Sequence, residues 1–186
     1  MNKNLIEKEI SSNEVFSGRV IRACVDEVEL PNGNTATREY VKHNGAVAIM
    51  AVTNEGKILI EEQFRYAHRK VFLEIPAGKL DSPEEKPLDA AIRELREETG
   101  AVAEKMTYLG VYIPSPAILG ERIYMYLAEG LTFGERELDE DEFLTVSEYD
   151  LDTLLSMVMN GEIEDGKTQI AVLKYKEILR QRANGK

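Results

Sequence analysis

Apolar and polar residues alternate along the first part of the chain in a way that predicts β structure. The alternation covers residues 14–43, and Pro31-Asn32-Gly33 is a strong turn signal within it. The run from Gly45 to Thr53 is almost entirely apolar, as expected of a strand that is buried on both faces. Shorter runs at residues 57–63 and 71–75 predict two further strands.

The pattern changes to a helical period after residue 86. Pro87 suits the first turn of a helix, where its missing N–H is not needed, and Gly100 is a natural C-terminal stop. Between them, four residues form one predicted apolar stripe: Leu88, Ala91, Ile92 and Leu95. The sequence therefore predicts one central helix between two β-rich regions.

The second half of the chain continues with strands and then helices. Strands are expected at residues 108–113, 122–127 and 143–146, and helices at about 151–159 and 167–180. This order predicts an α/β protein, an α/β/α sandwich with a mixed sheet. We expect residues 1–44 to form an N-terminal β appendage and residues 45–186 to form the main domain.

Composition narrows the class of protein. A chain of 186 residues with 43% hydrophobic residues suits a globular domain with a normal core. The net charge of −11 argues against a nucleic-acid partner, whose binding surface is usually basic. No apolar run is long enough to span a membrane, and the charged start of the chain lacks the apolar stretch of a signal peptide. With Cys24 as its one cysteine, the chain has no intrachain disulfide, and a cytoplasmic location is expected.

The central helix concentrates carboxylates. Glu94, Glu97 and Glu98 lie three or four residues apart or adjacent, so their side chains come together on a helix. Like charges at that spacing cost a few tenths of a kcal/mol per pair. A hard divalent cation such as Mg²⁺ would turn this repulsion into coordination. The alternative is a surface helix with a solvated acidic face.

The segment 78–101 resembles the Nudix box, usually written G-x5-E-x7-R-E-U-x-E-E-x-G-U with U aliphatic. Arg93 to Ala101 fits its second half. The first half has one extra residue: with Glu85 as the first glutamate six residues follow Gly78, whereas Glu84 keeps five but lengthens the second spacing to eight. We favour Glu85, with the extra residue in the loop at Ser82-Pro83.

The resemblance implies roles for residues of the box. In Nudix hydrolases the glutamates hold divalent cations, here Glu94, Glu97 and Glu98, together with the backbone carbonyl of Ala77. Mg²⁺ is the expected cofactor, with Mn²⁺ as another candidate. Arg93, four residues before Glu97, would orient a carboxylate through charge-assisted hydrogen bonds.

Two features beyond the box resemble the ADP-ribose pyrophosphatase branch of this family. Residues 73–80 read Leu-Glu-Ile-Pro-Ala-Gly-Lys-Leu, which is similar to the entry to the box in that branch. Pro116 lies fifteen residues after Ala101, a spacing typical of ADP-ribose enzymes, although Ala117 replaces a glycine of their loop. The alternative is that Pro116 only shapes a loop.

The N-terminal segment also resembles that branch, in which it packs in a homodimer. The resemblance places Arg65, which follows Glu62-Gln63-Phe64, near the substrate phosphates. Arg38 and Glu39 are candidates for contacts to the adenine or the terminal ribose. Surface salt bridges are the alternative for all three residues.

Six acidic residues crowd into residues 135–142. Such a run is usually a solvated loop. In relatives a glutamate of the corresponding loop positions or deprotonates the attacking water, and the candidates here are Glu140 and Glu142. His43 and His68 show no metal-ligand spacing, so we expect structural roles for them.

These resemblances imply a Mg²⁺-dependent hydrolase of a small nucleotide sugar. The expected reaction is hydrolysis of ADP-ribose to AMP and ribose 5-phosphate. Two alternatives remain open: the same chemistry on GDP-mannose or another nucleotide sugar, and a non-catalytic Nudix module that binds a nucleotide. The three intact glutamates favour an enzyme.

Overall fold

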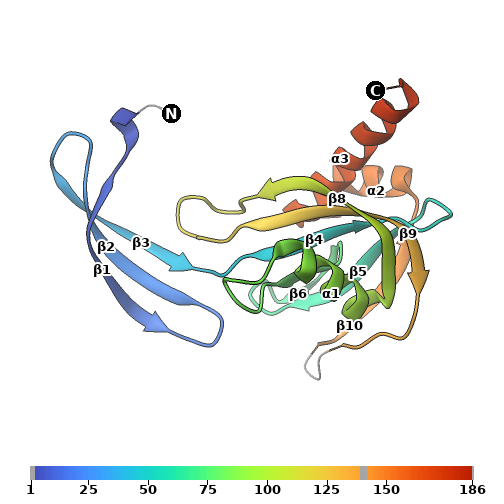
Figure 1. The fold of residues 1–186 in the computed structure, drawn as a ribbon, viewed down its shortest axis with the longest axis horizontal. Coiled ribbons are helices and arrows are strands. Elements are labelled where there is room, and N and C mark those ends of the chain that lie inside the picture. Colours follow the sequence, from blue (N-terminus) through green and yellow to red (C-terminus); the bar gives the residue numbers. More distant parts are fainter. Residues whose placement is uncertain (1–2, 139–141, 186) are drawn as a thin grey trace. The chain divides into compact units, whose positions relative to one another are not determined.

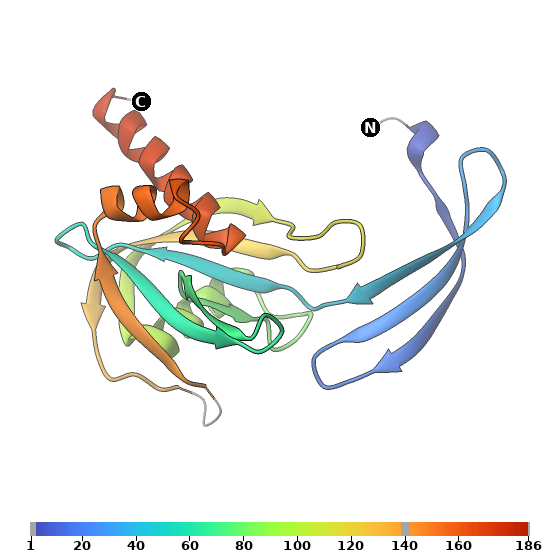
Figure 2. The same ribbon diagram turned by 180° about the vertical axis from the view of Figure 1, so that it is seen from behind.

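The computed structural model describes residues 3–138 and 142–185 (Figures 1 and 2). The chain forms two compact units. One contains the residues up to Asn44 together with Ile113–Arg122, and the other contains Gly45–Tyr112 and the chain from Ile123 onward.

The first unit is built on an antiparallel three-stranded sheet. After the short 3₁₀ helix η1 (Lys3–Leu5), the strands β1 (Lys8–Ser17), β2 (Arg22–Glu29) and β3 (Thr35–Lys42) lie in the order β1-β2-β3. Gly33 closes the β2–β3 turn with a positive φ of 84°, a conformation that favours glycine. The turn and the strands around it confirm the prediction, although β1 begins earlier than expected.

The second unit contains two sheets. Strands of the first lie in the order β7-β4-β9-β8, and those of the second in the order β10-β5-β6. Pairing of β4 with β9 is parallel, and the other strand pairs of the unit are antiparallel, so the first sheet is mixed. The strand bounds are β4 (Ala46–Ala51), β5 (Ile58–Arg65), β6 (Lys70–Glu74), β7 (Ala77–Lys79), β8 (Ala101–Tyr112), β9 (Ile123–Phe133) and β10 (Leu144–Tyr149).

Strand β4 lies between two hydrophobic clusters, which explains its continuous apolar sequence. Ala46, Ala48 and Met50 join a cluster that contains residues of α2 (Leu151–Met159) and α3 (Gly166–Ala183). The alternate residues Val47, Ile49 and Ala51 join a cluster that contains residues of α1 (Pro87–Thr99). Side chains therefore alternate between the two helical layers, as a period of two requires. The predicted α/β/α sandwich with a mixed sheet is confirmed.

Helix α1 has the predicted limits but not the predicted stripe. Pro87 occupies its first turn, and Gly100 ends it in the left-handed conformation with φ of 70°. Leu95 and Ala91 are buried as expected, whereas Leu88 and Ile92 are 41% and 45% exposed. The buried arc instead includes Ala90 and Glu98, because small alanines bring the helix close to the sheet and a glutamate occupies the next turn. The predicted stripe was therefore only half right.

Other element limits differ modestly from those predicted. Strand β8 starts directly after Gly100 and is much longer than the expected 108–113, and the short strand β7 was not predicted. The two C-terminal helices lie close to their predicted positions. Across residues 3–138 and 142–185, none of the helices combines the length and apolar character needed to cross a membrane.

Candidate active site

The site forms where β7 meets α1. Strand β7 is the edge partner of β4 and carries Ala77 and Gly78. A Cβ atom on Gly78 would lie 2.0 Å from Cδ of Glu94, so the carboxylate of Glu94 rests directly against the glycine backbone. A side chain at this position would displace the Glu94 carboxylate, so glycine is favoured here by this close approach and not by its backbone angles.

Arg93 binds several carboxylates at once. Its Nη1 donates to Glu94 at 2.8 Å and to Glu97 at 3.0 Å, and its Nη2 donates to the Lys79 carbonyl at 3.2 Å. The same guanidinium reaches Glu85, with Nη2 at 3.2 Å from Oε1. Charge-assisted bonds of this kind fix carboxylate orientation. Arg93 therefore links Glu85 of the preceding loop to the carboxylates of the helix.

Glu98 is the most deeply buried carboxylate of the helix, at 1% exposure. Its Oε2 accepts a hydrogen bond from the backbone N–H of Ala77 at 2.9 Å. Burial raises the pKa of Glu98 to about 10, and the negative charges of Glu61 and Glu94 act in the same direction. Burial likewise raises the pKa of Glu94 to about 7, despite the opposing charge of Arg93.

Glu61 of β5 is a buried carboxylate that the sequence analysis did not single out. It is 3% exposed, and its pKa is raised to about 8 by burial and by the charges of Glu142 and Glu74. Its Oε1 is buried without a hydrogen-bond partner among the residues that the structure describes. Glu61 lies two residues after Leu59, which packs on the α1 side of the sheet, so the two side chains share that face of β5.

The predicted phosphate-binding Arg65 lies in an ion-pair network. Its Nε and Nη2 donate to the two carboxylate oxygens of Glu74 at 2.7 and 2.8 Å. Lys167, near the start of α3, also donates to Glu74 and lies 3.1 Å from Asp165. Burial alone would raise the pKa of Glu74, but these two cations lower it to about 2. The sequence analysis assigned no role to Glu74 or Lys167.

Of the two acidic-loop candidates, Glu140 lies outside the described residues. Glu142 is described, and Gln63 Nε2 donates to its Oε1 at 3.5 Å. Its negative charge contributes to the raised pKa values of Glu61, Glu94 and Glu98. Glu142 therefore lies near enough to these buried carboxylates for its negative charge to affect their pKa values.

The remaining substrate-site candidates belong to the first unit. Arg38 donates to Glu7 through Nε at 2.9 Å, Glu39 is exposed on β3, and Pro116 is exposed in the segment 113–122. The structure thus brings together Ala77, Arg93, Glu94, Glu97 and Glu98 in the second unit. It does not place Arg38, Glu39 and Pro116 in that unit.

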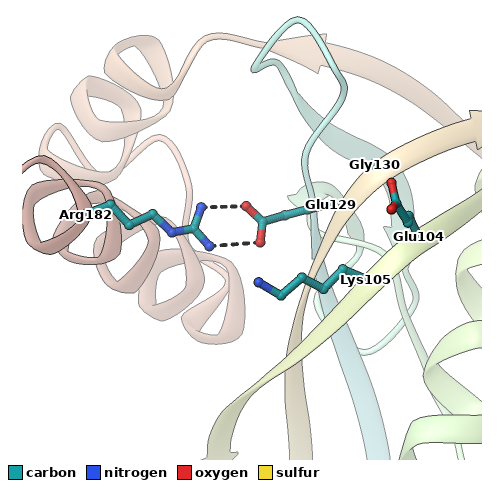
Figure 3. Close-up of a pocket in the computed structure, with 5 residues that line it drawn as sticks. All are labelled: Glu104, Lys105, Glu129, Gly130 and Arg182. Atoms are coloured by element: carbon teal, nitrogen blue, oxygen red, sulfur yellow. Dashed lines mark hydrogen bonds and ion pairs between the residues drawn. The ribbon is translucent and has the colours of Figure 1, made fainter. Parts of the chain in front are cut away.

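A separate hollow of about 360 Å³ is lined by residues of β8, β9 and α3 (Figure 3). Arg182 donates to both carboxylate oxygens of Glu129, at 2.5 and 2.9 Å, and Lys105 lies beside this pair. Opposite charges already offset one another there. The hollow shares no residue with the carboxylate site, and we assign it no role.

The donors around α1 suit a hard divalent cation. They are carboxylate oxygens that repel one another, with an unpartnered oxygen on Glu61 and a backbone segment at Ala77 held against Glu98. Within residues 3–138 and 142–185, no three Asp, Glu, His or Cys side chains already converge as a complete metal site. Arg93 holds two of the carboxylates, so the donors are adjacent but still engaged with protein partners.

This fold and site define a hydrolase with a glutamate-rich helix that is suited to divalent cations. Residues 42–169 match the NUDIX domain, and residues 7–41 match the nucleoside diphosphate sugar hydrolase N-terminal domain. The chain belongs to the NUDIX family, whose hydrolases generally use a divalent metal.

Two relatives match almost the whole chain. An ADP-ribose pyrophosphatase of Bacillus subtilis (strain 168) is 48% identical over 95% of this chain and 97% of its own length. A methanol dehydrogenase activator of Bacillus methanolicus is 46% identical over 98% of this chain and 100% of its own length. A crystal structure of an ADP compounds hydrolase shares the fold, with a TM-score of 0.83 and 21% identity over 96% of this chain and 97% of that chain.

Proposed function

We propose that this protein hydrolyses the pyrophosphate bond of ADP-ribose to give AMP and ribose 5-phosphate, or cleaves the same bond of a closely related nucleoside diphosphate sugar to give the corresponding nucleoside monophosphate and sugar phosphate. The observation that carries the proposal is the Arg93-centred group of carboxylates on α1, with buried Glu98 hydrogen-bonded to Ala77. The similarity to an ADP-ribose pyrophosphatase over 95% of the chain supports this substrate over other nucleotide sugars.

Glu94, Glu97, Glu98 and the carbonyl of Ala77 are the groups that we assign to metal binding. Mg²⁺ is the proposed ion, with Mn²⁺ as a substitute, because carboxylate and carbonyl oxygens suit both. When bound, such ions neutralise pyrophosphate charge and make a bound water more acidic. Arg93 keeps the carboxylates in place by its bonds to Glu94 and Glu97, so we assign it a positioning role.

The hydrolytic step needs a group that accepts the proton of the attacking water. The water oxygen bonds to one phosphorus, the bridging P–O bond breaks, and the bridging oxygen leaves with the other phosphate. We assign the proton to a carboxylate of the acidic loop, either Glu142 or Glu140. The electrostatic proximity of Glu142 to the helix carboxylates supports Glu142.

Arg65 is the proposed phosphate contact in the second unit. Its guanidinium is bound to Glu74 and remains 40% exposed, so one side of the group is held and another faces solvent. A guanidinium fixed in this way is suited to a phosphate oxygen because little freedom is lost on binding. Arg38, Glu39 and Pro116 are proposed contacts to the nucleoside or the terminal ribose.

We also propose a cytoplasmic homodimer, with residues 1–44 as the dimerisation segment and 45–186 as the hydrolase domain. Several large apolar side chains of the first unit are exposed, including Ile10, Val15 and Phe16. Exposed apolar surface of this kind is typical of an interface. Light scattering coupled to size-exclusion chromatography would test the dimer, and a monomeric mass would reject it.

Hydrolysis of a substrate panel tests the proposed reaction. ADP-ribose, GDP-mannose, NADH, diadenosine polyphosphates and 8-oxo-dGTP would each be assayed by product chromatography, with Mg²⁺, with Mn²⁺ and with EDTA. We expect metal-dependent turnover of ADP-ribose above the others. A preference for GDP-mannose would keep the chemistry and reject the substrate. Tight binding of one ligand without turnover would reject the enzyme in favour of a binding module.

A further inference from the structure

Glu61 lies beside the proposed metal ligands but comes from a different element. It is the fourth residue of β5, two residues after Leu59, which packs in the same cluster as Leu95 of α1. Residues two apart in a strand share a face, so Glu61 faces the α1 side of the sheet. Among the charges that act on Glu98, Glu61 is the strongest.

The positively charged side chains near Glu61 bind a different carboxylate, that of Glu74. Glu61 is directly opposite Glu74 across the β5–β6 pair, and Glu74 is bound by both Arg65 and Lys167. Arg136 contributes a weaker positive charge from the exposed chain after β9. Glu61 Oε1 is thus left without a hydrogen bond among the described residues, although Glu61 is 3% exposed.

A buried carboxylate oxygen without a partner loses its hydrogen bonds to water and gains none from the protein, which is unfavourable, above all when the group is charged. Burial of an unneeded glutamate at this position would be unfavourable, because β5 could carry an apolar residue there, as it does at Ile60 and Leu59. The negative surroundings on the α1 side disfavour an anionic ligand for Glu61 and favour a cation. The unpartnered Oε1 of Glu61 and the carboxylate of Glu98 are therefore suited to binding the same cation.

We propose that Glu61 is a further carboxylate ligand for the divalent cation that Glu98 holds. The inference rests on the proposed metal-dependent function. It adds β5 to the elements that hold the ion, which would otherwise be α1 and β7. An ion bound by Glu61 and Glu98 would join the strand to the helix across the α1-side cluster.

Metal binding to the full chain tests this role directly. Electron paramagnetic resonance of free Mn²⁺ would give the number of bound ions and their Kd for the wild type, Glu61→Gln and Glu62→Gln. Glu62 is the matched control, because it is adjacent in β5, is exposed, and accepts a hydrogen bond from Thr145 at 3.0 Å. We expect Glu61→Gln to raise the Kd of at least one ion about tenfold or more, and Glu62→Gln to leave it unchanged.

Thermal unfolding gives a second readout that a structural role would not reproduce. In EDTA, Glu61→Gln should unfold at a higher temperature than the wild type, because the glutamine needs neither to take up a proton nor to bury a charge on folding. The increase in Tm on adding Mn²⁺ should be smaller in the variant. If Glu61→Gln does not fold, Glu61→Leu matches the apolar neighbours in β5 and permits the same measurements.

The outcomes separate this inference from the proposed function. Wild-type Mn²⁺ affinity in Glu61→Gln, with an unchanged gain in Tm, would overturn the role of Glu61 and leave the metal-dependent hydrolase intact. The absence of both Mn²⁺ binding and turnover in the wild type would overturn the proposed function and this inference together.

Discussion

The contact between Gly78 and Glu94 allows a sharp test of how the site is positioned. In Gly78→Ala the new Cβ would lie 2.0 Å from Cδ of Glu94, whereas ordinary contact begins at 3.4 Å. The carboxylate must therefore move by about 1.4 Å (3.4 minus 2.0). Glu94 ends a flexible side chain, so it can move without a large change in the backbone.

We expect Gly78→Ala to lower kcat more than it lowers the stability of the fold. A misplacement of about 1 Å at a reacting centre can cost about 100-fold, which corresponds to about 2.7 kcal/mol in the activation free energy. Overpacking that a side chain can relieve costs about 1–3 kcal/mol of stability, towards the lower end here. We expect kcat for ADP-ribose to fall about 100-fold or more, with a circular dichroism spectrum like that of the wild type.

Gly134→Ala is the matched control. Gly134 has no left-handed backbone angle, and its added Cβ would make an ordinary contact of 3.8 Å with the Gly100 carbonyl. This variant should retain wild-type turnover. Near-normal kcat in Gly78→Ala would refute the argument that the close approach of Glu94 positions the site. An equal loss in Gly134→Ala would show that any added methyl group near α1 is harmful.

Three further predictions concern carboxylates. Glu98→Gln should lower kcat about 100-fold or more while the fold survives, and near-normal turnover would remove Glu98 from the metal site. Glu142→Gln should lower kcat about 10²–10⁴-fold with little change in KM, and the same result for Glu140→Gln alone would move the proton acceptor to Glu140. Glu74, with its pKa lowered to about 2, should contribute up to about 3 kcal/mol above pH 4.5, lost as the pH falls towards 2. Urea unfolding from pH 7 to pH 3 should therefore be less pH-dependent in Glu74→Gln, and identical slopes would contradict this.

Much of α1 was predictable because its signals are local. Pro87 and Gly100 set its ends through their own backbone properties, and the spacing of Glu94 and Glu98 needs only the helical period. The position of Arg93 among these carboxylates follows from the same period. Likewise, β4 was predictable because its apolar residues continue over both faces.

Features that depend on several elements were not predictable in this way. Periodicity did not reveal that Ile92 would be exposed while Glu98 was buried, because the sheet and not the helix decides which arc is covered. The pairing of Glu74 with Lys167 joins residues 93 positions apart. The proposed role of Glu61 depends on its position near α1, from which β6 and β7 separate it in the sequence.

The same carboxylates oppose folding and support the proposed chemistry. Burial raises the pKa values of Glu61, Glu94 and Glu98, so in the folded metal-free protein each of these groups must either take up a proton or hold an unfavourable buried charge. A ligand that binds only the folded state stabilises it by mass action, and a divalent cation would also relieve this repulsion. Cation binding should therefore stabilise the protein more than its affinity for exposed carboxylates would suggest. In a chain with a net charge of −11, such cations are also what would allow an anionic pyrophosphate to approach α1.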